Sequence, residues 1–287
     1  MFSQRGPVRR LPGRFCHTTA LALLVVFVAA CQTSATVPAA SSLPTANSAP
    51  TTAAIESQPI AGGPTLLRSN IALRKVALVE GGSIKLARNP ADNSLYILNA
   101  LHGLYRVTLS DIPTTSLVID STAIFTDAVP AGLAIAADGT IFVSGNRKVR
   151  TLYTQAIIRR GRPNGDNGVR WSTLATTAPY PLSDTPFDHL INGLAVSPDG
   201  QYLYINSGSR TDHGEVETNR GNFPKVREVP LTSAILRVPT NAENLVLPND
   251  EAGLRPYLFA DGTRNSFDPE FAPNGELFAG DNGPDAD

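Results

Sequence analysis

Four histidines are the first candidates for chemistry, because an imidazole can take up and release a proton near neutral pH. His17 lies in an N-terminal apolar segment, His102 in a predicted turn ("NALHGLY") and His213 in a polar stretch. His189 differs from them, since it comes just before a predicted apolar strand in "FDHLINGLAVSPDG". Two interpretations of His189 stay open: a proton-transferring residue beside a binding site, or a histidine hydrogen-bonded within a loop.

A second group of polar residues occupies "TRNSFDPEFAPNGELFAGDNGPDAD", residues 263–287. The pair Arg264 and Asn265 precedes two predicted strands joined by a tight Asn-Gly turn. Three aspartates, spaced by Asn, Gly and Pro, follow the second strand: Asp281, Asp285 and Asp287. This pattern of residue types predicts part of a ligand site.

A third group lies in "SRTDHGEVETNRGNFPKVREVPLTS", residues 209–233, which reads as an insertion between two strands. Its residue types are ones that bind metal ions: Asp212, His213, Glu215 and Glu217. Carboxylates at alternating positions need not converge, so a solvated loop is the favoured interpretation. A metal site stays open as the alternative.

Composition indicates a β protein that is rich in turns. The chain has 287 residues and 42% apolar content, enough for one large core or two small ones. Its formal net charge is -1, and nothing in it suggests a nucleic-acid surface. Gly and Pro occur 23 times each and methionine once, a profile more typical of a β fold than of a helical bundle.

Residues 1–30 are predicted to be a targeting segment, with a basic head and the short apolar stretch "TALALLVVFVAA". The segment runs into "VAAC", which resembles the bacterial lipobox, so Cys31 is expected to be lipidated and to become the new N-terminus. A signal peptide cleaved near Ala30 and an uncleaved anchor are the alternatives. Cys16 would be removed, which leaves no cysteine pair for a disulfide.

Residues 31–65 are rich in Ser, Thr, Ala and Pro and carry one charge, Glu56. No apolar periodicity runs through them, so they predict a disordered linker that lifts a domain off a membrane. The expected location is extracytoplasmic, on a bacterial membrane at the cell surface or in the periplasm.

From residue 70 onward one pattern recurs: an apolar strand, an Asx-Gly or Asp-Asn turn, and a second apolar strand. Its four instances are "IKLARNPADNSLYILNA" (84–100), "AGLAIAADGTIFVSGN" (131–146), "NGLAVSPDGQYLYINSGS" (192–209) and "FDPEFAPNGELFAGDNG" (267–283). The turn residues Asp92, Asp138, Asp199 and Asn274 lie 46, 61 and 75 residues apart. The first spacing is close to one four-stranded blade, and the longer ones would be blades with insertions. Outer strands are expected at 103–109, 149–154 and 234–240.

The sequence therefore predicts an all-β fold, a β-propeller over 66–287 with about four blades. A ring of four blades is the low end for propellers, and no closing strand is evident. An open ring would expose strand edges, so the chain is expected to be either a small closed propeller or, preferably, a piece of a longer one. In either case His189, just before an inner strand, would point toward the loops around the central channel.

The stretches "DHLINGLAVSPDGQYLYINSGS" and "GTRNSFDPEFAPNGELFAGDNGPDAD" together resemble the glucose/sorbosone dehydrogenase family. Members of that family are six-bladed propellers that use pyrroloquinoline quinone and calcium. The family places a histidine five residues before the leucine of an inner strand, as His189 stands before Leu194. It also places an Arg-Asn pair 19 residues ahead of a Gly-Pro pair, as Arg264 stands ahead of Gly283 (283 − 264 = 19).

The resemblance implies a role for each matching residue. His189 would be the general base that takes the proton of a substrate hydroxyl as hydride passes to the quinone. Arg264 would hold the quinone oxygen as charge develops there, and Asn265 would add a hydrogen bond to the cofactor. Asp188 would contact a sugar hydroxyl. The carbonyl groups of Gly283 and Pro284 would bind Ca²⁺, with the neighbouring carboxylates shaping the loop.

The implied function is an oxidoreductase that acts on a sugar or a sugar-like alcohol or aldehyde and passes electrons to an external acceptor. The family also clamps the quinone with Lys and Arg from later blades, which these 287 residues lack. The chain by itself is therefore expected not to hold the cofactor stably. A non-catalytic cell-surface propeller that binds carbohydrate or protein is the alternative, and a calcium-dependent lactone hydrolase ranks last.

Overall fold

The computed structural model describes residues 67–68, 70–71, 75–79, 81–109, 114–120, 124–165, 168–216, 218 and 225–284. All of them belong to one unit, Glu56–Asp287. The predicted signal peptide, the linker and Cys31 lie outside the described residues, as do Glu217, Asp285 and Asp287. Among the helices of the described part, none has the length and apolar character needed to cross a membrane.

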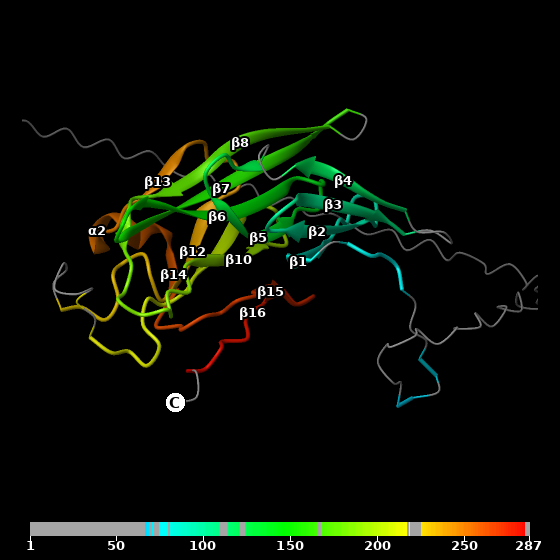
Figure 1. Cartoon of the computed structure of the whole chain (residues 1–287). Helices are drawn as coiled ribbons and strands as arrows, with labels where there is room; N and C mark the ends of the chain where they lie inside the picture. Colours follow the sequence, from blue (N-terminus) through cyan, green and yellow to red (C-terminus); the bar gives the residue numbers. More distant parts are fainter. Residues whose placement is uncertain are drawn as a thin grey trace, which may run out of the picture. The chain divides into compact units, whose positions relative to one another are not determined.

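Consecutive strands form one antiparallel sheet after another along the chain (Figure 1). Blade 1 consists of β1 (Ser83–Arg88), β2 (Leu95–Asn99), β3 (Gly103–Thr108) and β4 (Thr114–Asp120). Blade 2 consists of β5 (Val129–Ile135), β6 (Ile141–Arg150), β7 (Tyr153–Asn164) and β8 (Gly168–Thr177). Blade 3 consists of β10 (Ile191–Val196), β11 (Tyr202–Ser207), β12 (Ala234–Pro239) and β14 (Leu258–Asp261). The hairpin β15 (Glu270–Phe271) and β16 (Leu277–Phe278) begins blade 4.

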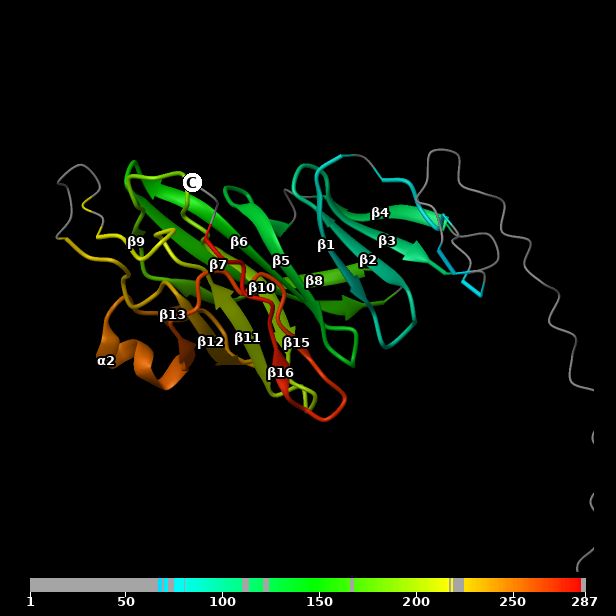
Figure 2. The same ribbon diagram turned by 90° about the horizontal axis from the view of Figure 1, so that it is seen from below.

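The predicted all-β propeller is thus confirmed, with three complete blades and the first hairpin of a fourth. The inner strands β1, β5, β10 and β15 are neighbours in that order, as Figure 2 shows from below. The sheets of the described part do not close into a ring.

The same kind of hydrogen bond, from a backbone N–H to a side-chain oxygen, closes all four predicted hairpin turns. Asp92, Asp138, Asp199 and Asn274 each accept a hydrogen bond from the backbone N–H two residues later, at distances of 2.9–3.1 Å. The residue after each of them has a positive φ angle: Asn93, Gly139, Gly200 and Gly275. Asp and Asn suit the first position because their side chains mimic a backbone turn, and Gly or Asn suits the second because it tolerates this φ.

The hydrophobic core lies between consecutive blades, because alternate residues of a strand point to opposite faces of its sheet. In β6, Ile141 and Val143 pack toward blade 1, whereas Phe142 between them packs toward blade 3. In β11, Leu203 and Ile205 pack toward blade 2, whereas Tyr204 contacts Phe271 of blade 4. Both faces of blades 2 and 3 are therefore buried, which explains why strands such as β6 begin with, and β11 contains, continuous apolar runs.

The segment between β12 and β14 adds further elements to the repeat. It contains β13 (Leu245–Leu247), the helix α2 (Glu251–Leu254) and the 3₁₀ turn η1 (Arg255–Tyr257). β13 pairs in parallel with β8 of blade 2, and the short β9 (Tyr180–Pro181) pairs with β7. The buried Arg160 of β7 donates hydrogen bonds to the carbonyl groups of Thr240 and Ala242, which fixes this segment to blade 2.

One predicted outer strand is wrong. Residues 149–154 were expected to form a strand, but Thr151 and Leu152 form the turn between β6 and β7. The other two predicted outer strands are confirmed as β3 and β12.

Candidate active site

A cavity of about 700 Å³ opens at one end of the inner strands, and its wall is formed by blades 1 to 3 and by the segment that leads into blade 4. Ile84 comes from blade 1, Ala131 from blade 2, Asn192 from blade 3, and Phe267 from the segment that leads into blade 4. Asp188 and His189 line the same cavity. We call it the mouth cavity, and its size falls in the usual range for small-molecule sites.

His189 is held by Ser209, which follows β11. The backbone N–H of His189 donates to the carbonyl oxygen of Ser209 at 2.9 Å, and the ring Nδ1 lies 3.1 Å from the same oxygen. The Ser209 Oγ–H donates to the carbonyl of Thr211 at 2.6 Å, so its proton is committed there. The two atoms near Nδ1, the carbonyl oxygen and the Oγ of Ser209, can therefore only accept a hydrogen bond from the ring. Nδ1 must carry the proton, which leaves Nε2 as the basic nitrogen.

Gly208 permits the approach of His189 to the neighbouring strand. A Cβ atom placed on Gly208 would clash with the Cβ of His189 and would lie 3.3 Å from the carbonyl oxygen of Leu190. Leu190 itself has a φ of 56°, in the left-handed region that bulky residues rarely adopt. The chain around His189 is thus held in a local geometry that other side chains at 208 would not allow.

Arg264 lies on the other side of Ser209. The backbone N–H of Ser209 donates to the carbonyl of Arg264 at 2.7 Å, so Ser209 stands between His189 and Arg264. The Arg264 guanidinium donates from Nε to the carbonyl of Asp212 at 3.1 Å and from Nη2 to the Asp212 carboxylate. Its Nη1 donates to the carbonyl of Asn282 at 3.3 Å.

Asn265 is linked to the wall of the mouth cavity through other amides. Its side-chain oxygen accepts a hydrogen bond from Asn192 at 2.9 Å, and Asn206 donates to the Asn192 side-chain oxygen at 2.7 Å. All three side chains are buried, and the Oδ1 atom of Asn206 has no hydrogen-bond partner. Since the two ends of an amide point apart, the Asn265 NH₂ group is turned away from Asn192.

Asp281 shapes the Arg264 segment. Its carboxylate accepts hydrogen bonds from the backbone N–H of Arg264 at 2.9 Å and of Asn265 at 2.7 Å, and from the hydroxyl of Ser266 at 3.1 Å. The structure therefore confirms the expectation that this carboxylate organises the loop.

Gly283 and Pro284 come after Asn282 and are exposed to solvent. Within the described residues, no group of three or more His, Cys, Asp or Glu side chains gathers as a metal site would. Main-chain carbonyl oxygens are among the ligands that a hard cation such as Ca²⁺ takes. The role of Gly283 and Pro284 as calcium ligands stays a prediction.

Asp188 is half-buried, and its carboxylate is bound to one neighbouring residue. It accepts hydrogen bonds from the backbone N–H of Ser183 at 2.9 Å and from the Ser183 hydroxyl at 3.1 Å. Burial raises the pKa of this carboxyl above its usual value, against the lowering effect of the bonds from Ser183 and of the charge on Arg210.

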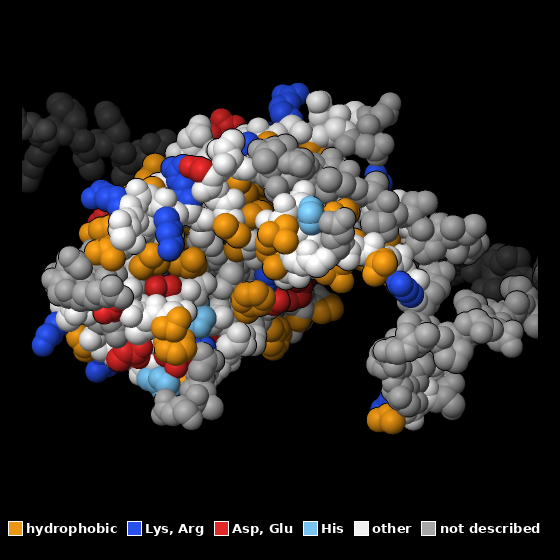
Figure 3. Space-filling model, in the orientation of Figure 1, with side chains coloured by type: hydrophobic (Ala, Val, Ile, Leu, Met, Phe, Trp, Pro, Cys, Tyr) orange, Lys and Arg blue, Asp and Glu red, His pale blue; other side chains and the backbone are white. Residues whose placement is uncertain are grey.

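The start of the insertion is buried, which corrects the interpretation of the whole stretch as a solvated loop. Ser209, Arg210, Thr211 and Asp212 are each no more than 5% exposed. The Glu228 carboxylate accepts bonds from the N–H groups of Arg210 and Thr211 and from the Thr211 hydroxyl, and Arg210 donates to the Leu182 carbonyl. Figure 3 shows histidine and acidic side chains at the surface of one face of the molecule.

Sequence reasoning missed Ser209 and the contact of Asp212 with Arg264. The structure places the predicted pair Arg264 and Asn265 near His189. Ser209 connects Arg264 to His189, and Asp212 binds the Arg264 side chain. Asp212 had been grouped with possible metal ligands by residue type alone. The one signal for Ser209 was its place at the end of a strand next to the predicted histidine strand.

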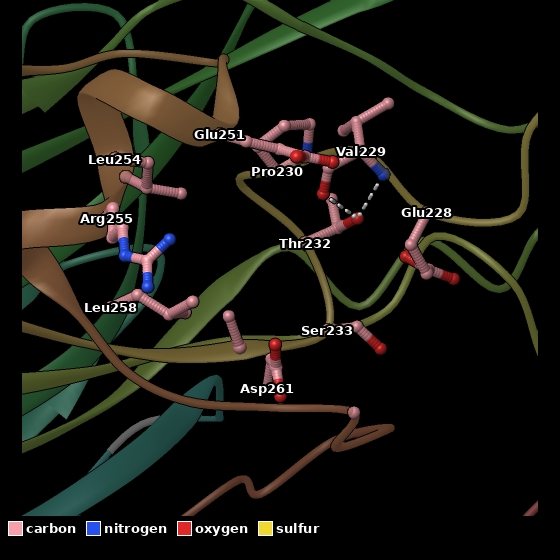
Figure 4. A pocket seen from close by; sticks show the side chains of 12 residues that line it. Glu228, Val229, Pro230, Thr232, Ser233, Glu251, Leu254, Arg255, Leu258 and Asp261 are labelled. Carbon is pink, nitrogen blue, oxygen red and sulfur yellow. Dashed lines mark hydrogen bonds between the residues drawn. The ribbon is translucent and has the colours of Figure 1, made fainter.

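Two further cavities accompany the mouth cavity. One of about 580 Å³ continues along the inner strands and is lined by residues 84–88, 133–135, 194–196 and 268–270. Another, of about 930 Å³, lies beside α2, and Figure 4 shows Leu254 and Arg255 on one side of it and Thr232 and Glu228 on the other. None of the predicted site residues lines the cavity beside α2.

Solved structures with the same fold are sugar-acting enzymes. A Trichoderma reesei protein of Carbohydrate-Active Enzymes family AA12 matches with a TM-score of 0.52 and 21% identity, over 74% of this chain and 48% of that one. A calcium structure of the Trichoderma reesei protein matches with a TM-score of 0.51. A glucose dehydrogenase matches with a TM-score of 0.51 and 17% identity, over 74% of this chain and 66% of that one.

The chain shares their fold. The propeller that the resemblance implied is therefore confirmed, while the chain spans about half of the length of the Trichoderma protein and about two thirds of the glucose dehydrogenase. No protein-family profile matches the sequence, and neither does any curated protein.

Proposed function

We propose that the full-length protein is an oxidoreductase that uses pyrroloquinoline quinone and oxidises a sugar or a sugar-like alcohol or aldehyde. The observation that carries this proposal is the arrangement around Ser209. A histidine with a basic Nε2 lines a cavity formed by blades 1 to 3 and the segment that leads into blade 4, and an arginine lies on the other side of the same serine.

The similar structures support the class of reaction. A glucose dehydrogenase and a carbohydrate-active enzyme share the propeller, and their names place both among proteins that act on sugars. Because fold does not determine function, the proposal depends further on the residues of the site.

The residues of the site fit an anionic, oxygen-rich cofactor. Arg264 offers a cationic fork, and the NH₂ group of Asn265 is turned away from its partner Asn192. The quinone would supply the acceptor for the two electrons and the hydrogen removed from the substrate carbon.

The protein itself would bind and orient the substrate and the cofactor, and it would accept the proton. His189 would receive the proton of the substrate hydroxyl at Nε2, and Ser209 would stabilise the resulting imidazolium through the bond from Nδ1. Arg264 would stabilise negative charge next to the cofactor, and Asp188 would accept a hydrogen bond from a sugar hydroxyl.

Calcium would bind at the loop that follows Asp281. Gly283 and Pro284 are exposed, and their carbonyl groups are hard oxygen donors close in sequence to Asp281, which binds the Arg264 segment. A calcium structure of the Trichoderma protein supports this choice of ion. We further propose that Cys31 carries a lipid that anchors the protein to the outside of a bacterial membrane, where an external acceptor would reoxidise it.

The test is reconstitution of the full-length protein with the quinone and Ca²⁺. We expect a shift of the quinone absorbance on binding, dye reduction with a panel of aldoses, and loss of both on treatment with EDTA. Arg264→Ala should lower the quinone affinity by at least about tenfold, the loss of a typical charge-assisted contact. Sugar binding without quinone uptake or dye reduction would instead support a non-catalytic carbohydrate-binding propeller.

A further inference from the structure

The Arg264 side chain is oriented by one residue of the insertion. Two of its nitrogen atoms donate to Asp212: Nε to the backbone carbonyl at 3.1 Å and Nη2 to the carboxylate. The contact joins residues that are 52 positions apart in the sequence, and both side chains are well shielded, at 12% exposure for Arg264 and 3% for Asp212. A charge pair in this setting is screened little by solvent.

Asp212 is itself held in place from both sides along the chain. Its backbone N–H donates to the Glu215 carboxylate at 2.9 Å, and its second carboxylate oxygen lies 3.0 Å from Nδ1 of His213. The two residues before it are fixed by Glu228, which accepts three hydrogen bonds from Arg210 and Thr211. Asp212 is therefore a rigid acceptor and has little freedom to follow a moving arginine.

We propose that Asp212 is the positioning residue of Arg264, and that the insertion serves to present it. This inference rests on the proposed function, in which Arg264 contacts the quinone. Contacts at Nε and at one terminal nitrogen fix the plane of a guanidinium, so the cation is already oriented when the cofactor arrives. The Asp212 carboxylate also balances a buried positive charge that would otherwise be costly.

Asp212 acts through Arg264 in this proposal and touches neither substrate nor cofactor. Its removal should therefore have two linked effects. Arg264 should become more accessible, and the affinity for the quinone or the turnover at saturating quinone should fall. A merely structural role would lower stability without changing either quantity.

The experiment compares the full-length parent with Asp212→Asn, which keeps the size and one oxygen acceptor of the side chain. Asp261→Asn is the matched control, because Asp261 is an exposed carboxylate three residues before Arg264 with no part in the site. The first readout is the rate at which phenylglyoxal modifies Arg264, followed by peptide mass mapping. We expect the rate to rise about tenfold in Asp212→Asn and to stay unchanged in the control. A tenfold rise corresponds to a tenfold loss in the equilibrium that keeps Arg264 bound to Asp212.

The second readout is a quinone titration and dye reduction in a double-mutant cycle. Asp212→Asn should weaken quinone binding or lower turnover about tenfold, and Asp212→Asn with Arg264→Gln should be no worse than Arg264→Gln alone. An unchanged modification rate of Arg264, or additive losses in the cycle, would overturn the positioning role. A parent protein that neither binds quinone nor reduces dye would overturn the proposed function, while the modification rate would still decide whether Asp212 holds Arg264.

Discussion

At the scale of single residues, the candidate site depends on atoms that do no chemistry themselves. Ser209 fixes the tautomer of His189, and Gly208 makes room for it. Neither residue carries a chemical signature in the sequence, because one is a serine after a strand and the other a glycine beside it.

Gly208→Ala tests this support directly. The new Cβ would clash with the Cβ of His189, so the histidine strand has to shift. We expect a loss of about 1–3 kcal/mol in the free energy of unfolding, typical of overpacking, together with a fall in dye reduction by the full-length protein. Gly81→Ala is the control, since a Cβ at Gly81 would have no atom within 4 Å. Equal activity of the two variants would show that the spacing at 208 is unimportant.

Asp188 provides a prediction on pH. Burial raises its pKa in the folded state, so the folded protein holds this proton more tightly than the unfolded chain does. The contribution to stability is therefore present below the unfolded pKa, near 3.9, and is lost as the pH rises through the folded pKa. Asp188→Asn removes the titration but keeps an oxygen for the bonds from Ser183.

Denaturant titrations from pH 4 to pH 8 measure this effect. The free energy of unfolding of Asp188→Asn, relative to the parent, should increase from pH 4 upward and then level off. A difference that is constant over this range would mean that the carboxyl titrates normally.

The residue types of the candidate site could be predicted from the sequence, but the hydrogen bonds and ion pairs that join them could not. The resemblance to a known family implied His189, Arg264 and Asn265, and the structure brings them together around Ser209. The contact between Asp212 and Arg264 joins residues 52 positions apart, so no local pattern could reveal it. The predicted roles of Gly283 and Pro284 stay predictions.

At the scale of elements, the hairpins were predictable wherever the turn needed a special backbone conformation. Each confirmed turn has Asp or Asn followed by a residue with positive φ. The β6–β7 turn was missed because Thr151 and Leu152 carry no such signal, and the flanking residues read as one continuous strand. β13 was not predictable either, since it has three residues and pairs with a strand about 70 positions earlier.

Asp138→Ala measures the contribution of one turn. The backbone N–H of Thr140 would lose its 2.9 Å acceptor, and Thr140 is buried. We expect the free energy of unfolding to fall by about 0.5–1.5 kcal/mol, the usual net value of such a bond. Asp138→Asn keeps an acceptor, so its free energy of unfolding should fall by less. Equal losses in the two variants would assign the effect to something other than this hydrogen bond.

At the scale of the whole molecule, one ion pair connects the first blade to the fourth. Lys85 of β1 donates to the carbonyl of Phe267 at 3.0 Å and pairs with the Asp268 carboxylate, and its Nζ lies 3.3 Å from the centre of the Phe267 ring. Burial lowers the pKa of Lys85, against the raising effect of Asp268. Phe267 also lines the mouth cavity, so this pair fixes part of the cavity wall.

A double-mutant cycle tests whether the pair holds the blades together. Asp268→Ala should lower the free energy of unfolding by about 1–3 kcal/mol, because it leaves a buried ammonium without its counter-charge. Lys85→Met should cost less than about 1.5 kcal/mol, and adding Asp268→Ala to it should cost nothing more. Additive losses would mean that the two residues stabilise the propeller independently.

The central claim is that His189 accepts the substrate proton in a quinone-loaded cavity. The most direct measurement is turnover of the full-length protein and of its His189→Gln variant, both reconstituted with pyrroloquinoline quinone and Ca²⁺ and checked by quinone titration. We expect the quinone affinity to change by less than about threefold while turnover falls by about 10²–10⁴, the usual contribution of a general base. Turnover of the variant within about twofold of the parent at equal quinone loading would contradict this claim.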